Sequence, residues 1–356
     1  MKITKNNDII HTRRINEDLN IFLKNYKSEN ILVLTDENCQ KHCLPLLPCL
    51  EERGASVFTF APGEKSKNID TLQKIWIFMQ EKKIDRNSLI IATGGGVVTD
   101  IAGFASTTFK RGVDFLNIPT SLLAQVDASA GGKNGINFRG LKNEIGTFSS
   151  PVKVFIDTVF LHTLPEKEFR SGFAEMLKHG LIYDYKYYEK LIRYYAIHSS
   201  GNLDLETISN LVKQSVEIKQ HFVNRDFRDN NIRHILNFGH TFGHAFESFF
   251  NTEKQTTVLH GYAVAWGMIC ALYLAVKKTG FSKSCFEKIK HEIKQIYSLP
   301  NISSEKYFDF AQIMLHDKKN IQKKIMCVLP HSPGQADKLY PIDYKDIKES
   351  LNQLNS

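Results

Sequence analysis

The chain has 356 residues, 42% of them hydrophobic and 24% charged, so it is long enough for a sizeable core and for two domains. Its net charge of +8 comes from basic residues spread along the sequence, which argues against nucleic acid as a partner and suits an anionic small substrate. Six cysteines without a CxxC pair, and an N-terminus without an apolar signal-peptide core, predict a cytoplasmic protein.

Residues 1–160 alternate strand-like and helix-like patterns. Because continuous apolar strands alternate with amphipathic helices, we predict an α/β, Rossmann-like domain with a parallel sheet that is covered on both faces. The expected strands are 31–36, 55–60, 88–96, 113–119 and 152–157, and the expected helices are 39–53, 68–83 and 97–109.

After residue 160 the strand patterns fade and helical spacing takes over, which predicts an all-α C-terminal domain over residues 161–356. Residues 323–330 are the one run there that reads as a strand. The run 258–276 is nearly free of charge, but His260, two glycines and two tyrosines predict a buried helix and no membrane span. The expected helices are 165–182, 205–223, 232–250, 258–278 and 282–297.

A glycine cluster, Thr93–Gly96, lies where an expected strand hands over to a helix. Glycines at such a place let backbone N–H groups approach a pyrophosphate, and the helix N-terminus favours its charge. The pattern is not GxGxxG, so a plain tight turn is the competing interpretation. Asp100, among apolar neighbours, would suit a hydrogen bond to a ribose or nicotinamide group.

The block 111–146 carries charged and polar residues among glycines and small residues, namely Arg111, Asp127, Lys133, Lys142 and Asn143. A glycine-rich loop with two lysines is a reasonable cradle for phosphate oxygens. Each lysine alone is more often a solvated surface charge, but together with Asp127 between apolar residues they indicate a polar pocket.

The stretch 232–247, IRHILNFGHTFGHAFE, predicts one helix with a polar stripe of Arg233, Asn237, His240 and His244. Such a stripe must face a partner or a polar cavity, because unpaired burial is costly. Two histidines one turn apart can bind a metal, although satisfied structural histidines are the commoner case. The HTFGH sequence lacks the glutamate of a zinc protease.

In order along most of the chain, these and other motifs resemble the 3-dehydroquinate synthase family of sugar-phosphate cyclases. The matching motifs are PGEKSK (62–67), GGGVVTDIAGFAS (94–106), KRGV (110–113), IPTSLLAQVDASAGGK (118–133), KNEIGTF (142–148), FAEMLKHGLI (173–182), LNFGHTFGHAFE (236–247), LHG (259–261) and DKK (317–319).

The resemblance implies a catalytic zinc (or cobalt) ion held by Glu175, His240 and His260, with open positions for two substrate hydroxyls. It implies conversion of 3-deoxy-D-arabino-heptulosonate 7-phosphate to 3-dehydroquinate and phosphate, a shikimate-pathway step of aromatic amino acid biosynthesis. The steps would be transient oxidation by NAD, phosphate elimination, reduction, ring opening and intramolecular aldol closure. The leaving phosphate can serve as the base, so no conspicuous Glu/His dyad is needed.

The resemblance also implies which residues contact NAD and substrate. Arg111 would reach the phosphate from a neighbouring subunit, which implies a homodimer. Lys178, Lys219 and Arg233 match the carboxylate and hydroxyl side, and Arg233 discriminates this family from cyclases whose substrates lack a carboxylate. The phosphate side is matched by Lys133, Asn143, Asn237, His244 and one of Lys318 or Lys319. The cofactor side is matched by Asp36, Glu64, Lys67, Gly95, Gly96, Val97, Asp100, Thr120, Ser121, Asp127, Lys133 and Lys142.

The chain departs from the family pattern at a few positions. The family usually has the sequence HGE at residues 260–262, and here Tyr262 replaces the glutamate. This replacement could alter the hydrogen bonds that orient the metal ligands. The acidic segment before Arg233, the GVVTD form of the glycine loop and Thr120–Ser121 in place of paired threonines match only in part.

Three alternatives stay open at this point. Another sugar-phosphate cyclase is disfavoured by Arg233 and Asn237. A metal-dependent NAD alcohol or glycerol dehydrogenase leaves the lysines of residues 131–143 without a purpose. An inactive nucleotide-binding scaffold is suggested by Tyr262 alone.

Overall fold

The structure, a computed structural model, describes residues 8–27, 30–198, 203–253, 257–315 and 324–355. The chain forms two compact units. The first unit comprises Met1–Pro165 and Leu203–Val216, and the second unit comprises Glu166–Asn202 and Glu217–Ser356.

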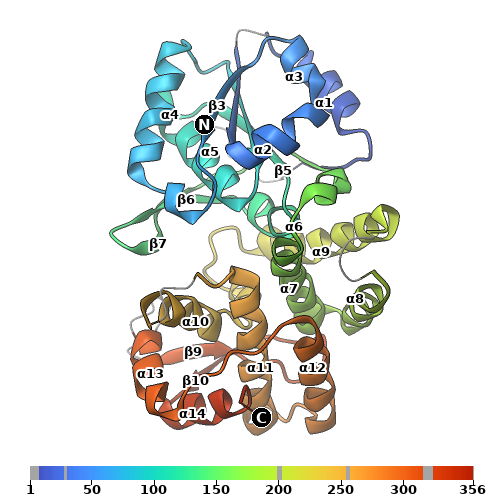
Figure 1. Cartoon of the computed structure of the whole chain (residues 1–356), viewed down its shortest axis with the longest axis vertical. Helices are drawn as coiled ribbons and strands as arrows, with labels where there is room; N and C mark the ends of the chain where they lie inside the picture. Colours follow the sequence, from blue (N-terminus) through green and yellow to red (C-terminus); the bar gives the residue numbers. More distant parts are fainter. Residues whose placement is uncertain (1–7, 28–29, 199–202, 254–256, 316–323, 356) are drawn as a thin grey trace. The chain divides into compact units, whose positions relative to one another are not determined.

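The first unit is built on a parallel six-stranded sheet in the order β1-β8-β5-β4-β2-β3. Helices lie around this sheet (Figure 1), which confirms the predicted α/β class. Its central strands are runs of buried apolar residues, as expected of a sheet that is covered on both faces. Only β1 was not predicted, because three residues are too few to give a pattern. The strands are β1 (Ile9–His11), β2 (Ile31–Asp36), β3 (Ser56–Phe60), β4 (Leu89–Gly94), β5 (Asp114–Pro119) and β8 (Lys153–Ile156).

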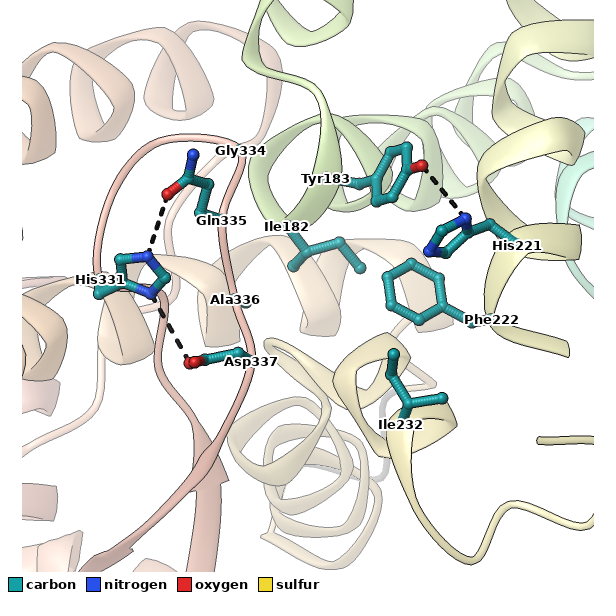
Figure 2. A pocket seen from close by; sticks show the side chains of 10 residues that line it. All are labelled: Ile182, Tyr183, His221, Phe222, Ile232, His331, Gly334, Gln335, Ala336 and Asp337. Atoms are coloured by element: carbon teal, nitrogen blue, oxygen red, sulfur yellow. Dashed lines mark hydrogen bonds and ion pairs between the residues drawn. The ribbon is translucent and has the colours of Figure 1, made fainter. Parts of the chain in front are cut away.

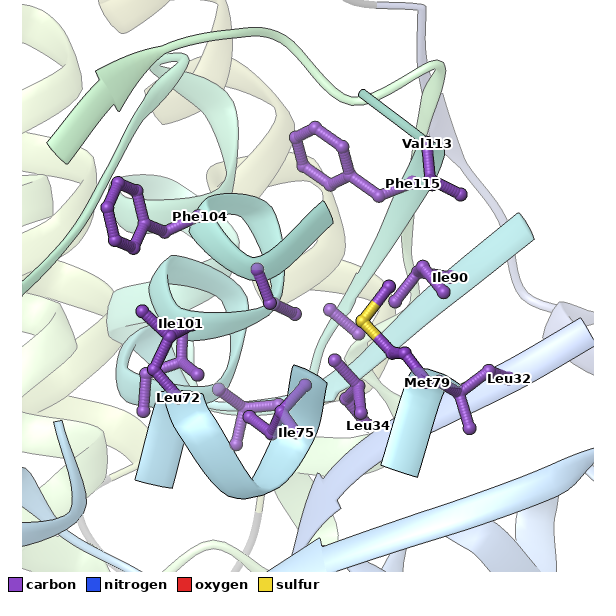
Figure 3. Close-up of a cluster of buried hydrophobic side chains, with 14 of the residues drawn as sticks. Leu32, Leu34, Leu72, Ile75, Met79, Ile90, Ile101, Phe104, Val113 and Phe115 are labelled. Carbon is purple, nitrogen blue, oxygen red and sulfur yellow. The ribbon is translucent and has the colours of Figure 1, made fainter. Parts of the chain in front are cut away.

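Helices cover both faces of this sheet because successive strand side chains point to opposite sides. Leu32 and Leu34 of β2 belong to a core shared with α4 (Ile69–Glu81) and α5 (Gly96–Thr108), part of which is drawn in Figure 3. Ile31 and Val33 of the same strand belong to the opposite core, shared with α1 (Ile15–Leu23) and α3 (Pro48–Glu52).

The helix predicted over residues 39–53 is wrong as a single element. The chain forms α2 (Glu37–His42), a short 3-10 turn (Leu44–Leu46) and α3 (Pro48–Glu52). Pro45 and Pro48 lie at the start of the second and third pieces, and a proline lacks the N–H that a continuous helix would need there. Gly54, with φ of +65°, ends the run as expected.

The strand order creates a switch point at the carboxyl ends of β2 and β4. After β2 the chain continues to the edge strand β3, whereas after β4 it continues to β5 on the opposite side. The connections therefore leave in opposite directions, and this is where doubly wound sheets bind their ligands. Asp36 ends β2 and Gly94 ends β4, so both lie at this point.

The glycine-rich block near residue 140 is a hairpin where the sequence predicted a loop. β6 (Lys133–Phe138) pairs antiparallel with β7 (Leu141–Phe148). Gly135 faces Gly146 across the pair, and a Cβ on Gly135 would meet the Ile145 carbonyl at 2.7 Å. These glycines thus allow the two strands to approach closely. The sequence pattern does not distinguish glycines with this role from glycines in a loop.

The second unit is helical, as predicted, with one addition. The strand expected in residues 323–330 is confirmed as β9 (Ile325–Val328), and the addition is β10 (Leu339–Ile342), which pairs with β9 in a two-stranded sheet. None of the helices in the described part of the chain has the length and hydropathy that a membrane span requires. The helices are α7 (Glu166–Tyr183), α8 (Tyr185–His198), α10 (His240–Glu253), α11 (His260–Lys278), α12 (Lys283–Ile296), α13 (Tyr307–Leu315) and α14 (Tyr344–Asn352), while α9 (Leu205–Arg225) belongs partly to each unit.

Candidate active site

Three strand ends of the first unit converge on the glycine cluster. Thr35 at the end of β2 donates its hydroxyl to the Thr93 carbonyl at 2.8 Å, and the Thr120 N–H donates to the Gly94 carbonyl at 3.0 Å. Asp36 follows Thr35, and its carboxylate accepts the Cys39 N–H at 2.8 Å as the N-cap of α2. The predicted residues Asp36, Gly95, Gly96 and Thr120 are thereby gathered at the switch point.

Gly95 and Gly96 begin α5 in a confined place. A Cβ on Gly96 would lie 3.2 Å from the Ala128 side chain, and a Cβ on Gly95 would lie 3.5 Å from the Ser121 hydroxyl. Ser121 caps the short helix α6 (Leu122–Val126), whose last cap residue is Asp127. The backbone N–H groups at the start of α5 are thus bordered by Ser121 and Ala128. Val97, the next residue of α5, is partly exposed. This suits a pyrophosphate.

Lys67 joins two other predicted residues that lie far apart in the sequence. Its buried ammonium donates to the Asp100 carboxylate on α5 and to the Asn143 side-chain carbonyl on β7, each at 2.5 Å. Glu64, one turn earlier, accepts the Asn137 side-chain amide at 2.8 Å. The hairpin is therefore tied to the segment 64–67 and to α5 by polar side chains.

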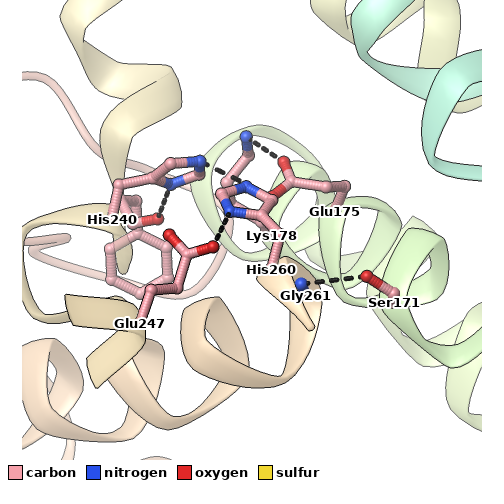
Figure 4. Close-up of polar contacts among 8 residues, drawn as sticks. Ser171, Glu175, Lys178, His240, Glu247, His260 and Gly261 are labelled. Atoms are coloured by element: carbon pink, nitrogen blue, oxygen red, sulfur yellow. Dashed lines mark hydrogen bonds and ion pairs between the residues drawn. The ribbon is translucent and has the colours of Figure 1, made fainter. Parts of the chain in front are cut away.

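The second unit holds a group of three potential metal ligands that come from three helices (Figure 4). Glu175 lies in α7, His240 begins α10 and His260 begins α11. One ligand atom of each residue lies within 4.8 Å of the others. The Glu175 Oε1 atom is 3.6 Å from His240 Nε2 and 3.5 Å from His260 Nε2.

The donor set fits a divalent cation. Glu175 is fully buried, and its Oε1 atom receives no hydrogen bond from the described residues, while Oε2 accepts the Lys178 ammonium. A buried carboxylate oxygen without a hydrogen bond is costly, and a cation among the three atoms would compensate it. One carboxylate and two imidazoles leave coordination positions open, as in catalytic zinc sites.

The electrostatics of the group keep Glu175 ionised. Burial by itself would raise the pKa of Glu175, but the Lys178 ammonium and the two imidazoles hold this pKa well below its usual range. Burial lowers the pKa of His240 well below its usual range, so this imidazole is neutral and able to bind a metal. For His260 burial is outweighed by Glu175 and Glu247, which raise its pKa to about 10.

The other nitrogen of each histidine meets an oxygen. His240 Nδ1 lies 3.1 Å from the Phe238 carbonyl, and His260 Nδ1 lies 3.5 Å from the Glu247 carboxylate (Figure 4). Such partners fix the tautomer and the ring orientation of metal-binding histidines. Sequence reasoning missed Glu247, although its position seven residues after His240 places both on one helix face.

Tyr262 takes no part in this arrangement. Its ring packs edge-on against Tyr297, with centroids 5.2 Å apart, and it interacts with Arg170. The carboxylate beside His260 is supplied by Glu247, and not by the residue that follows the His260–Gly261 pair.

The single helix predicted over residues 232–247 is wrong. Residues Ile232–Asn237 form a 3-10 helix, the chain turns at Phe238–Gly239, and α10 begins at His240. Gly239 has φ of +78°, and a Cβ there would lie 2.9 Å from the Val264 carbonyl of α11. Close packing on α11 therefore breaks the helix, and Arg233 and Asn237 do not share a stripe with the histidines.

The remaining predicted residues of the second unit are placed as follows. The His244 ring centroid is 5.6 Å from that of His240 and 6.3 Å from that of His260, and His244 is not among the three ligands. Arg233 is buried, and its guanidinium donates to the Phe227 carbonyl at 2.7 Å. Lys178 and Lys219 are also buried, with 1% and 4% of their surface exposed. Lys318 and Lys319 lie outside the described residues.

Arg111 does not join the other predicted residues of the first unit. It lies between the end of α5 and the start of β5, on the side of the sheet where the amino ends of the parallel strands lie. The glycine cluster lies at the carboxyl edge, about 20 Å away along a six-residue strand. Lys133 and Lys142, on the hairpin, are exposed.

A separate surface pocket of about 350 Å³ lies in the second unit (Figure 2). It contains none of the predicted site residues. Its polar members include Tyr183, whose hydroxyl is 3.2 Å from His221 Nδ1, and His331, which is 3.6 Å from Asp337. The lining residues are Ile182, Tyr183, His221, Phe222, Ile232, His331, Gly334, Gln335, Ala336 and Asp337.

The fold is similar to that of several solved enzymes. Over 98% of this chain and 97% of the other, it resembles 2-epi-5-epi-valiolone synthase from Streptomyces hygroscopicus, solved with NAD+ and Zn2+, with a TM-score of 0.87 and 22% identity. Over 97% of this chain and 96% of the other, it resembles 2-deoxy-scyllo-inosose synthase in complex with carbaglucose-6-phosphate, NAD+ and Co2+, with a TM-score of 0.84 and 22% identity. An iron-containing alcohol dehydrogenase gives a TM-score of 0.67 at 16% identity, over 98% of this chain and 97% of the other. At these identities the likeness concerns the fold.

Sequence comparison is more specific. Residues 57–171 match the family model of the 3-dehydroquinate synthase N-terminal domain, and residues 172–320 match that of its C-terminal domain. The chain is 38% identical to a 3-dehydroquinate synthase of Parabacteroides distasonis over 97% of this chain and 96% of the relative. It is 40% identical to one of Clostridium botulinum over 92% and 93%. With both halves matched and the relatives aligned over nearly their whole length, the chain belongs to the 3-dehydroquinate synthase family.

Proposed function

We propose that this chain is a 3-dehydroquinate synthase, which converts 3-deoxy-D-arabino-heptulosonate 7-phosphate to 3-dehydroquinate and phosphate. The observation that carries the proposal is the convergence of Glu175, His240 and His260, in a chain whose two halves match the two domains of that family. The reaction makes it a carbon–oxygen lyase of the shikimate pathway.

The proposed cofactors are NAD in the first unit and zinc or cobalt in the second. Bound NAD supplies a reversible hydride acceptor, and the bound metal acidifies the substrate hydroxyl that is oxidised. At the switch point, Asp36, Glu64, Lys67, Asp100 and the start of α5 would hold the dinucleotide. In the second unit, Lys178 keeps the Glu175 carboxylate ionised, so that it can bind a cation at neutral pH.

The proposed substrate contacts are cationic because the substrate carries a carboxylate and a phosphate. Arg233 would bind the carboxylate, since its planar guanidinium suits a two-point contact. Lys178 and Lys219 would complete this side, and both are held in the interior by the fold. The proposed phosphate contacts are Lys133, Asn143, Asn237, His244 and one of Lys318 or Lys319.

We propose further that the chain acts as a homodimer in the cytoplasm. Arg111, at the amino edge of its own sheet, would serve the phosphate of a neighbouring subunit. The thiols of all six cysteines are free, which suits a reducing compartment. In this scheme residues 1–160 form the NAD-binding domain, and residues 161–356 form the metal- and substrate-binding domain.

Replacement of one metal ligand tests the metal assignment. We expect His260→Ala to lose stoichiometric zinc and turnover, because only Glu175 and His240 remain as ligands, while NAD still binds to the first unit. Metal content is measured by elemental analysis, and NAD binding by calorimetry. Full zinc retention in this variant would place the metal elsewhere and contradict the proposed site.

A further inference from the structure

Glu247 is a buried carboxylate that no proposed substrate or cofactor contact uses. It lies in α10 with 8% of its surface exposed, and its Oε1 atom is 3.5 Å from His260 Nδ1 (Figure 4). A carboxylate in the interior is costly unless a charged or hydrogen-bonding partner faces it. The ring of His260 provides such a partner from the neighbouring helix α11.

The contact lies on the far side of the His260 ring from Glu175. His260 Nε2 faces the Glu175 Oε1 atom at 3.5 Å, whereas Nδ1 faces Glu247. A histidine that donates Nδ1–H to an oxygen keeps its Nε2 lone pair for a metal. Once a cation displaces the proton from Nε2, Glu247 would therefore hold the remaining proton on Nδ1, which is the tautomer that the three-residue group needs.

The two histidines are supported by different means. His240 Nδ1 meets the Phe238 carbonyl, a backbone group that belongs to the same segment. His260 lies at the first position of α11, after Leu259 as N-cap, and its ring has no comparable backbone contact in the described residues. Tyr262 packs against Tyr297, whereas Glu247 is the side chain that faces His260 Nδ1.

We propose that Glu247 is the positioning residue for His260, holding its ring so that Nε2 points at the metal. This inference rests on the proposed metal centre. α10 thus supplies one ligand, His240, and two turns later the carboxylate that orients a ligand of another helix. The role is one of metal affinity and ligand geometry, since Glu247 is not one of the three residues whose ligand atoms lie within 4.8 Å of one another.

The test compares Glu247→Ala and Glu247→Gln with the wild-type chain. Zinc affinity of the metal-free protein is measured by competition with a chromogenic chelator, and ligand geometry by the visible spectrum of the cobalt-loaded protein. We expect Glu247→Ala to weaken zinc binding about 10- to 100-fold and to change the cobalt spectrum. Glu247→Gln keeps an acceptor for Nδ1–H, so we expect a smaller loss.

Glu292→Gln is the matched control. Glu292, on α12 of the same unit, accepts a hydrogen bond from the Tyr188 hydroxyl at 2.8 Å and lies 3.9 Å from the Lys288 ammonium, and it is not one of the residues of the metal group in the described part of the chain. Glu292→Gln removes one negative charge and keeps the shape of the side chain, as Glu247→Gln does, and we expect its zinc affinity to equal that of the wild type. If Glu247→Ala does not fold, a loss in Glu247→Gln that Glu292→Gln does not show supports the proposal.

The outcomes separate this inference from the proposed function. Zinc binding by the wild type, together with equally tight binding by both Glu247 variants, would overturn the positioning role alone. A wild-type chain that binds no zinc would overturn the metal centre and the positioning role together. Weaker zinc binding in the variants, with unchanged binding in Glu292→Gln, supports the proposal.

Discussion

At the scale of residues, the candidate site is marked by charges that the fold holds in its interior. Glu175 and Lys178 are both almost fully buried and paired with one another. A buried ion pair contributes little net stability, because both charges lose their hydration. Such a pair is therefore better explained by what it does for the metal group than by stability.

The site residues were only partly predictable from the sequence. The family motifs gave Glu175, His240 and His260, which the structure brings together. Local spacing alone pairs His240 with His244, because residues four apart share one helix face. It cannot identify ligands such as Glu175 of α7 and His260 of α11, which lie on other helices. Glu247 was missed because its partner, His260, lies on a different helix and no local pattern links the two.

Arg233 offers a prediction about substrate recognition. We expect Arg233→Ala to raise the KM for the sugar phosphate by at least about 30-fold, because truncating a buried charged contact costs 2 kcal/mol or more. We expect kcat to change less, and Arg233→Lys to recover only part of the loss. Steady-state kinetics measure the effect, with the exposed Arg225 as control in Arg225→Ala. An unchanged KM would refute the carboxylate contact.

At the scale of elements, the sequence predicted those whose pattern is local. The buried strands β2, β4 and β5 and the amphipathic helix α4 match their predicted ranges closely, because period and turn residues define them. The prediction of one helix over residues 232–247 was wrong because the break at Gly239 is caused by packing against α11, which begins more than 20 residues later. The β6–β7 hairpin was not predicted because a glycine-rich sequence is the same in a loop and in a closely paired hairpin.

Gly261 shows how closely two of these elements approach. It follows His260 in α11, its N–H donates to the Ser171 hydroxyl of α7 at 3.0 Å, and a Cβ there would lie 1.9 Å from the Ser171 carbonyl oxygen. The two helices that carry His260 and Glu175 therefore need a glycine at this contact.

We accordingly expect Gly261→Ala to force α11 away from α7, to destabilise the chain by about 1–3 kcal/mol, and to weaken zinc binding. Thermal unfolding and chelator competition measure the two effects. Gly54→Ala is the control: its φ is +65° but nothing lies within 4 Å, so we expect a loss of stability with unchanged zinc affinity. Wild-type zinc affinity in Gly261→Ala would show that this contact does not position His260.

At the scale of the whole molecule, the role proposed for Arg111 involves a second copy of the chain. Arg111 lies at the amino edge of its sheet, opposite the glycine cluster, and so cannot act beside it within the first unit. The order of motifs along the sequence predicted its role, but neither composition nor local pattern says which subunit it serves.

Mixing two inactive variants tests this role. If Arg111 acts across subunits, a hybrid dimer of Arg111→Ala and His260→Ala contains one complete site. In that site the Arg111→Ala subunit supplies the metal ligands and the His260→Ala subunit supplies the arginine. We expect refolded mixtures to recover on the order of one quarter of wild-type turnover, since half of the dimers are hybrids with one working site. If Arg111 serves its own subunit, no hybrid site is complete and the mixture stays inactive.

The measurement that tests the central claim most directly is turnover of 3-deoxy-D-arabino-heptulosonate 7-phosphate with NAD and zinc, following phosphate release and NADH absorbance together. The account predicts stoichiometric phosphate release with NAD at catalytic concentration and no accumulation of NADH, because the hydride is returned within each cycle. Accumulation of NADH without phosphate would identify a dehydrogenase and contradict the proposed function. Absence of both signals from a protein that binds NAD and zinc would contradict it as well.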